Sequence, residues 1–144
     1  MLYMGRFIHK PTVVLADDNG AVLTVTSMLL MGEFDVVATV VDGDDAIRVT
    51  NALQPDVVIL DIAMPGTDGI AAARRLKTLG LDPRIIFLTI QEDSDYVQVA
   101  LGLGASYVLK PRLHSDLLPA IRESLAGRVF ISSPLRNSAV PVVN

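Results

Sequence analysis

Five short runs of apolar residues recur along the chain and constrain its fold more than any other feature. They occupy residues 13–16, 36–41, 57–60, 85–88 and 107–109. The runs are continuous and rich in β-branched residues, whereas a strand with one wet face alternates apolar and polar side chains. Runs this short are typical of strands that are buried on both faces of a parallel sheet.

Helical patterns fill the intervals between these runs. Apolar residues recur at helical spacing over 46–53, 70–76, 97–101 and 118–125, and residues 19–31 supply the remaining helix. This regular alternation of strands and helices predicts a doubly wound α/β fold. In such a fold, right-handed crossovers place helices on both faces of a parallel sheet.

The length of 144 residues corresponds to about one domain. We expect an N-terminal extension at residues 1–11, a domain at 12–131 and a C-terminal tail at 132–144. Ser115 or Asp116 is the expected N-cap of the last helix, because both side chains can accept hydrogen bonds from the free N–H groups of a first helical turn.

The composition excludes several classes of function. The chain has no cysteine, so it carries no disulfide, thiolate metal site or cysteine nucleophile. Its net charge of −4 and its pI near 5.0 argue against direct binding of nucleic acid. No apolar run approaches the ~18 residues of a membrane span, and we find no signal peptide, so a soluble cytoplasmic protein is expected.

Polar side chains follow four of the five apolar runs, at the point where each predicted strand ends. Asp17 and Asp18 follow the first run, Asp61 the third, Thr89 the fourth and Lys110 the fifth. Ligands of open α/β sheets bind beyond the carboxyl ends of the strands. We therefore expect three carboxylates, a hydroxyl and an ammonium group to converge at one edge of the sheet.

This group of side chains is suited to phosphoryl transfer with Mg²⁺. Clustered carboxylates repel one another, and a hard divalent cation with oxygen ligands compensates that repulsion. Asp18 and Asp61 are the predicted direct ligands, and Asp17 is predicted to act through water. Asp61 stands alone at its strand end and is the natural acceptor for an acyl phosphate, with Lys110 and Thr89 positioned to contact phosphoryl oxygens.

The ordered set of motifs resembles the receiver domain of bacterial two-component response regulators. The segments that carry the resemblance are Asp17-Asp18-Asn19, Asp61 with Met64-Pro65-Gly66-Thr67-Asp68-Gly69, Leu88-Thr89, Gly104-Ala105 and Tyr107 to Pro111. The resemblance covers about residues 12–131. It implies a flavodoxin-like (βα)5 sandwich, with five parallel strands in the order 2-1-3-4-5.

The resemblance also implies roles for individual residues. Asp61 would be phosphorylated by a sensor histidine kinase in a Mg²⁺-dependent reaction. Asp18, Asp61 and the backbone carbonyl of Ala63 would hold the metal, and Lys110 and Thr89 would contact the phosphoryl group. The chain would then be a signalling switch that catalyses only its own phosphorylation and dephosphorylation.

Thr89 and Tyr107 correspond to the switch pair of this family, in which the hydroxyl moves toward the phosphoryl group and the aromatic ring turns inward. The family often has a cis bond at the position of Lys110–Pro111. Two departures stand out here. Only Ser106 separates the Gly-Ala pair from Tyr107, where the family usually has two residues, and Ile90 replaces a residue that is often small.

Residues 116–130 resemble the NarL/LuxR-type subfamily, whose full-length members usually carry a C-terminal helix-turn-helix domain. The tail at 132–144 is too short for one, so the chain is either the receiver part of a transcriptional regulator or a stand-alone receiver acting through protein contacts. A third interpretation is a Mg²⁺-dependent phosphohydrolase with an aspartyl nucleophile. Ala63 stands where that chemistry needs a second carboxylate.

The predicted first helix, at residues 19–31, contains no charged side chain. One interpretation makes Thr24, Thr26 and Ser27 its wet side. The other is an exposed apolar patch that pairs with a second copy of the chain, together with the last helix around 118–125, to form a homodimer.

Overall fold

The computed structural model describes residues 9–135, which form one parallel sheet covered by helices on both faces. The strands are β1 (Thr12–Ala16), β2 (Asp35–Val40), β3 (Val57–Leu60), β4 (Arg84–Thr89) and β5 (Ser106–Leu109). They pair in the order β2-β1-β3-β4-β5, and every pair is parallel. The predicted doubly wound fold and its strand order are therefore confirmed.

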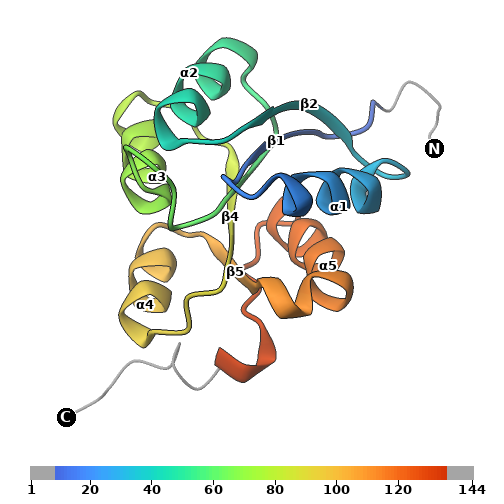
Figure 1. The fold of residues 1–144 in the computed structure, drawn as a ribbon, viewed down its shortest axis with the longest axis vertical. Helices are drawn as coiled ribbons and strands as arrows, with labels where there is room; N and C mark the ends of the chain where they lie inside the picture. Colours follow the sequence, from blue (N-terminus) through green and yellow to red (C-terminus); the bar gives the residue numbers. More distant parts are fainter. Residues whose placement is uncertain (1–8, 136–144) are drawn as a thin grey trace.

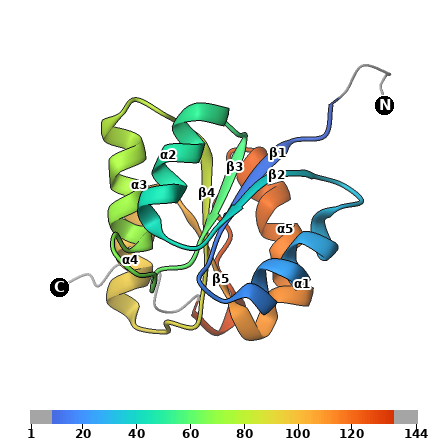
Figure 2. The same ribbon diagram turned by 45° about the horizontal axis from the view of Figure 1, so that its top comes forward.

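Five α-helices connect and follow the strands (Figure 1). They are α1 (Gly20–Leu30), α2 (Gly43–Leu53), α3 (Gly69–Thr78), α4 (Ser94–Gly102) and α5 (Leu113–Leu125). Helices α1 and α5 cover one face of the sheet, and α2, α3 and α4 cover the other (Figure 2). No helix in the described part of the chain is long and apolar enough to cross a membrane.

Side chains of each inner strand alternate between two buried clusters, one on each face of the sheet. Val14, Val58 and Phe87 belong to the cluster beneath α2, α3 and α4. Val13 and Ile59, one position away, belong to the cluster beneath α1 and α5. This alternation explains why the strand sequences are apolar without a break, since both faces of the inner strands are dry.

Strand β2 departs from the expectation that all five runs are buried on both faces. Its residues alternate between exposed and half-buried, and the exposed apolar residues include Val37 in the strand and Val41 directly after it. Strand β2 lies at the edge of the sheet beside β1, and alternate residues along it, Asp35, Val37 and Thr39, are exposed.

The last helix begins earlier than predicted. Residues Lys110–Arg112 form a 3-10 turn that runs directly into α5, so Arg112 occupies the N-cap position and neither Ser115 nor Asp116 does. Asp116 instead lies buried in the first turn, where Arg112 Nε donates to it at 2.8 Å. No peptide bond between residues 9 and 135 is cis, so the family's cis bond at Lys110–Pro111 is absent.

Candidate functional site

Three carboxylates and one ammonium group meet beyond the carboxyl ends of β1, β3 and β5. Asp17, Asp18 and Asp61 each offer a carboxylate oxygen, and these oxygens lie within 4.8 Å of one another. Lys110 Nζ lies 2.9 Å from Asp17 Oδ2 and 2.8 Å from Asp61 Oδ2. The strand ends thus bring together four of the side chains singled out in the sequence.

Two of the three carboxylates in this cluster, those of Asp17 and Asp61, are buried. Burial raises the pKa of Asp17 above its ordinary value. Hydrogen bonds from Lys110 and from the Asn19 N–H lower this pKa, and the nearby negative charge of Asp61 raises it, so that the overall change is a rise. Burial alone would lower the pKa of Lys110, but the two carboxylates that it contacts raise it overall. Lys110 therefore remains protonated and compensates part of the negative charge.

The two oxygens of Asp61 have different surroundings. Oδ2 accepts a hydrogen bond from Lys110 Nζ, whereas Oδ1 is buried and has no hydrogen-bond partner among residues 9–135. Burying an unpaired carboxylate oxygen is costly. Together with exposed Asp18 and buried Asp17, the carboxylate of Asp61 forms an all-oxygen donor set that fits a hard divalent cation.

Two glycines allow the loop after β3 to pack closely. Gly69 N donates to Ile62 O at 2.8 Å, and a Cβ atom at Gly69 would lie 2.0 Å from the Asp61 carbonyl oxygen. Gly66 has a φ of +70°, which favours glycine. The loop therefore fixes the backbone on which Asp61 and Ala63 sit, and the Ala63 carbonyl stays a predicted metal ligand.

Thr89 and Tyr107 are both buried and meet at the backbone of Gln91. The Gln91 N–H donates to Thr89 Oγ1 at 3.3 Å, and the Tyr107 hydroxyl donates to the Gln91 carbonyl at 2.8 Å. Tyr107 points inward, with its ring 6.4 Å from that of Phe87, and burial raises the pKa of its phenol. In the described residues no bond joins Thr89 to the carboxylates, so its contact with a phosphoryl group stays a prediction.

The sequence did not reveal that Gln91 contacts both Thr89 and Tyr107, because it does so through its main-chain N–H and carbonyl groups. Ile90 has a side chain that is 65% exposed, so it lies at the surface beside the buried Thr89. Although the loop before β5 is one residue shorter than is usual in the family, Tyr107 pairs with Phe87 in the sheet and is buried.

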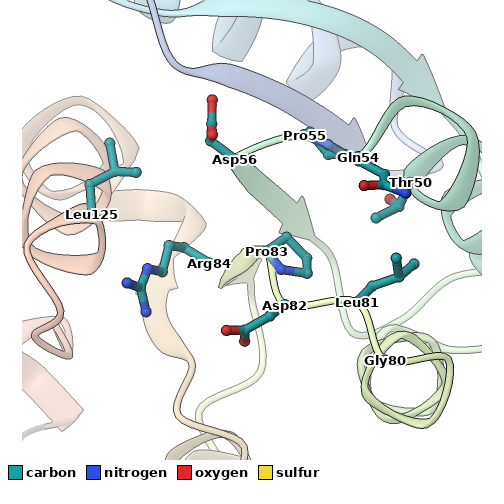
Figure 3. Close-up of a pocket in the computed structure, with 10 residues that line it drawn as sticks. All are labelled: Thr50, Gln54, Pro55, Asp56, Gly80, Leu81, Asp82, Pro83, Arg84 and Leu125. Atoms are coloured by element: carbon teal, nitrogen blue, oxygen red, sulfur yellow. The ribbon is translucent and has the colours of Figure 1, made fainter.

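A separate cavity of about 420 Å³ lies at the opposite end of the sheet (Figure 3). It is lined by residues around the starts of β3 and β4, including Asp56 and Arg84, and by Leu125 of α5. None of the residues predicted for the phosphoryl site contributes to it. This cavity is therefore unconnected with the carboxylate cluster.

The fold and the carboxylate cluster define a doubly wound α/β domain with an acidic site at the carboxyl edge of its sheet. The sequence model of the response regulator receiver domain matches residues 13–122, and the chain belongs to this family. It is a receiver domain of a NarL/LuxR-type two-component response regulator, which is a class of signalling protein rather than of metabolic enzyme. The predicted family and subfamily are thereby confirmed.

Individual relatives support this assignment. The oxygen regulatory protein NreC of Staphylococcus haemolyticus is 34% identical over 132 residues, which are 89% of this chain and 61% of that protein. A LuxR-family response regulator from Aurantimonas sp. SI85-9A1 is 30% identical with a TM-score of 0.85, covering 91% of this chain and 96% of its own. The chain thus spans about three fifths of the length of its curated relative.

A third comparison concerns assembly. A structure described as two RcsB dimers bound to two parallel DNAs contains a chain that is 26% identical, with a TM-score of 0.82. The match covers 91% of this chain and 68% of that chain.

Proposed function

We propose that Asp61 accepts a phosphoryl group from a phosphohistidine of a sensor histidine kinase. The observation that carries this proposal is the pair of unlike oxygens on Asp61, one held by Lys110 and one buried without a partner. The free oxygen forms the new bond to phosphorus, the phosphorus–nitrogen bond of the donor breaks, and the histidine takes up a proton. The product is an acyl phosphate on Asp61.

The neighbouring residues orient and neutralise the transferred group. Bound Mg²⁺ would supply positive charge to the phosphoryl oxygens, held by Asp18, Asp61 and the carbonyl of Ala63, with Asp17 acting through water. Lys110 holds Asp61 in place before transfer and contacts the phosphoryl group afterwards. Phosphoryl transfer requires mainly positioning and charge neutralisation from the protein, and this set of residues supplies both.

Asp61→Asn is expected to abolish phosphorylation. The test is intact mass after incubation with acetyl phosphate and Mg²⁺, where the unaltered protein gains one phosphoryl group and Asp61→Asn gains none. Asp82→Asn is the matched control, because Asp82 is exposed and lines the cavity at the opposite end of the sheet. The unaltered protein should also remain unmodified without Mg²⁺. An equal adduct on Asp61→Asn would contradict the assignment of the acceptor.

We further propose that Thr89 and Tyr107 carry the signal away from the site. In this proposal the Thr89 hydroxyl donates to the phosphoryl group, and its bond from the Gln91 N–H is exchanged for that new contact. The Tyr107 hydroxyl is bound to the same residue, so both side chains contact one backbone segment, at Gln91. The output that fits the relatives is control of transcription; a stand-alone receiver acting through protein contacts is the alternative.

We also propose that the domain forms a homodimer through α1 and α5. The exposed face of α1 is apolar, with Met28 and the adjoining Met31 each 65% exposed, whereas Thr26 is buried and is not part of the wet side suggested by one interpretation. Helix α5 lies beside α1, and its Arg122 forms a two-pronged ion pair with Glu33. Exposed apolar patches of this kind mark interfaces.

Met28→Lys is expected to weaken this dimer by at least about tenfold, because it places a charge in an apolar contact. Light scattering after size exclusion, at several concentrations and with beryllium trifluoride to mimic the phosphoryl group, measures the change. Leu53→Lys on α2 is the control, since Leu53 is 51% exposed on the other face of the sheet and should leave the dimer intact. A protein that stays monomeric in both states would contradict the proposal.

A further inference from the structure

The chain does not leave the domain after α5 but returns along the outer edge of β5. We call residues 129–135 the return segment. Tyr107 N donates to Phe130 O at 2.9 Å, Ser132 N donates to Tyr107 O at 2.9 Å, and Ile131 pairs with Tyr107 as a parallel bridge. Figure 1 shows this part in red beside β5. Both main-chain groups of the predicted switch residue are thus bonded to the return segment.

A buried polar junction holds the middle of this segment. Ser132 is fully buried, and its hydroxyl accepts from Leu109 N at 3.1 Å and donates to Asp116 Oδ2 at 2.8 Å. Arg112 and Ser115 also donate to the Asp116 carboxylate. Burial tends to raise the pKa of Asp116, but the bonds from Arg112, Ser132 and Ser115 lower it overall, so this acceptor stays charged.

Apolar contacts anchor the segment from the other side. Ile131 is 9% exposed and Leu135 is 4% exposed, and both belong to the buried cluster that contains Tyr107 and Leu109. The return segment therefore closes the same part of the core that the inward ring of Tyr107 fills.

These contacts join the return segment to the phosphoryl site through a single strand. Leu109, whose N–H is held by Ser132, directly precedes Lys110, whose ammonium group contacts Asp61. Tyr107, two residues earlier, is the predicted switch. Docking of the return segment thus holds the backbone of Tyr107 and that of Leu109, the residue before Lys110.

We propose that the return segment is a latch, and that its docking on β5 and the phosphorylation of Asp61 stabilise each other. This inference rests on the proposed function of Asp61. Docking of residues 129–135 would then report the state of the acceptor. Because such coupling is reciprocal, loss of docking weakens the phosphorylated state by the same factor by which phosphorylation strengthens docking.

Amide hydrogen exchange, followed by NMR on the whole chain, tests the latch. The reporters are the amides of Tyr107 and of residue 132, whose acceptors are main-chain oxygens that a change of side chain leaves in place. Ser132→Ala is expected to speed exchange at both by at least about tenfold, because it removes a bond to a charged carboxylate. Ser133→Ala is the matched control, since Ser133 is exposed, and it should stay within about twofold of the unaltered protein.

Adding Mg²⁺ and beryllium trifluoride, which mimics a phosphoryl group on a carboxylate, tests the coupling. Exchange at both reporters should slow several-fold in the unaltered protein, and Ser132→Ala should bind beryllium trifluoride more weakly by a similar factor. Leu135→Ala serves as a second variant that loosens the segment from its apolar side, should Ser132→Ala fail to fold.

The outcomes separate the latch from the proposed function. If Ser132→Ala and Ser133→Ala exchange alike, the latch is wrong, whatever happens at Asp61. If beryllium trifluoride binds without slowing exchange in the unaltered protein, the coupling is wrong, while phosphorylation measured by intact mass still upholds Asp61 as the acceptor. If Asp61 takes no phosphoryl group from a donor, the proposed function fails together with the coupling that rests on it.

Discussion

Replacing Lys110 by methionine is expected to destabilise the folded domain by about 3 kcal/mol at neutral pH in the absence of divalent cations. The variant leaves Asp17 and Asp61 as buried carboxylates without their shared cation, and breaking a buried pair in this way typically costs about 3–5 kcal/mol. Urea unfolding in the presence of a chelator measures the loss. Lys77→Met is the control, since Lys77 is exposed on α3.

The effect should depend on pH with a defined sign. Burial raises the pKa of Asp17 in the folded state above the ordinary value of 3.8, which applies to the unfolded chain. Between the pKa of the unfolded chain and the higher pKa of the folded state, the folded protein keeps a proton on Asp17 that the unfolded chain has released. Stability from this group is therefore present at acidic pH and is lost as the pH rises through that range. Removing Lys110 removes a bond that lowers this pKa, which widens the range.

The loss of stability caused by Lys110→Met should consequently become smaller as the pH falls toward the ordinary value of the Asp17 pKa. Added Mg²⁺ should also restore part of the stability, because a cation bound by the folded state alone stabilises that state. A variant as stable as Lys77→Met at neutral pH in chelator would show that Lys110 does not compensate the cluster.

Gly69→Ala is expected to cost about 3 kcal/mol or more, or to prevent folding. A Cβ atom at Gly69 would lie 2.0 Å from the carbonyl oxygen of Asp61 and 2.9 Å from its carbonyl carbon, and backbone atoms cannot yield as a flexible side chain does. The loop would have to move, and Asp61 with it. Urea unfolding and the yield of soluble protein measure the damage.

Gly102→Ala is the matched control for this prediction. Gly102 is the last residue of α4, and a Cβ atom there meets nothing within 4 Å. Alanine also favours a helix more than glycine does, by up to about 1 kcal/mol, so this variant should be as stable as the unaltered protein or slightly more stable. If Gly69→Ala behaved like Gly102→Ala, the close approach to Asp61 would not be a structural requirement.

The sheet and the acidic cluster could be predicted because both depend on local patterns. Continuous apolar runs identify inner strands, and the polar residue after each run marks the carboxyl edge where side chains converge. The same reasoning failed for β2, since a run of valines does not tell an edge strand from an inner one. The interpretation that places Thr26 on the wet side of the first helix is likewise wrong, since Thr26 is buried.

Features that depend on main-chain partners, or on side-chain partners far apart in the sequence, could not be predicted. The Gln91 carbonyl that binds Tyr107 has no side-chain signature, and neither does the close contact between Gly69 and Asp61. Asp116 resembles an N-cap in sequence, yet a 3-10 turn starts the helix earlier and turns Asp116 into the centre of a buried junction. Ser132 carries no periodicity that would reveal its partner sixteen residues away.

The return segment also determines where this sheet can meet other chains. An uncovered edge strand presents free N–H and C=O groups that pair readily with foreign strands and lead to aggregation. Residues Phe130 and Ser132 occupy those groups on Tyr107, so among the described strands β2 keeps the open flank. A fragment that ended at α5 would expose a second flank. Its tendency to aggregate would then reflect a bare edge rather than an unstable core.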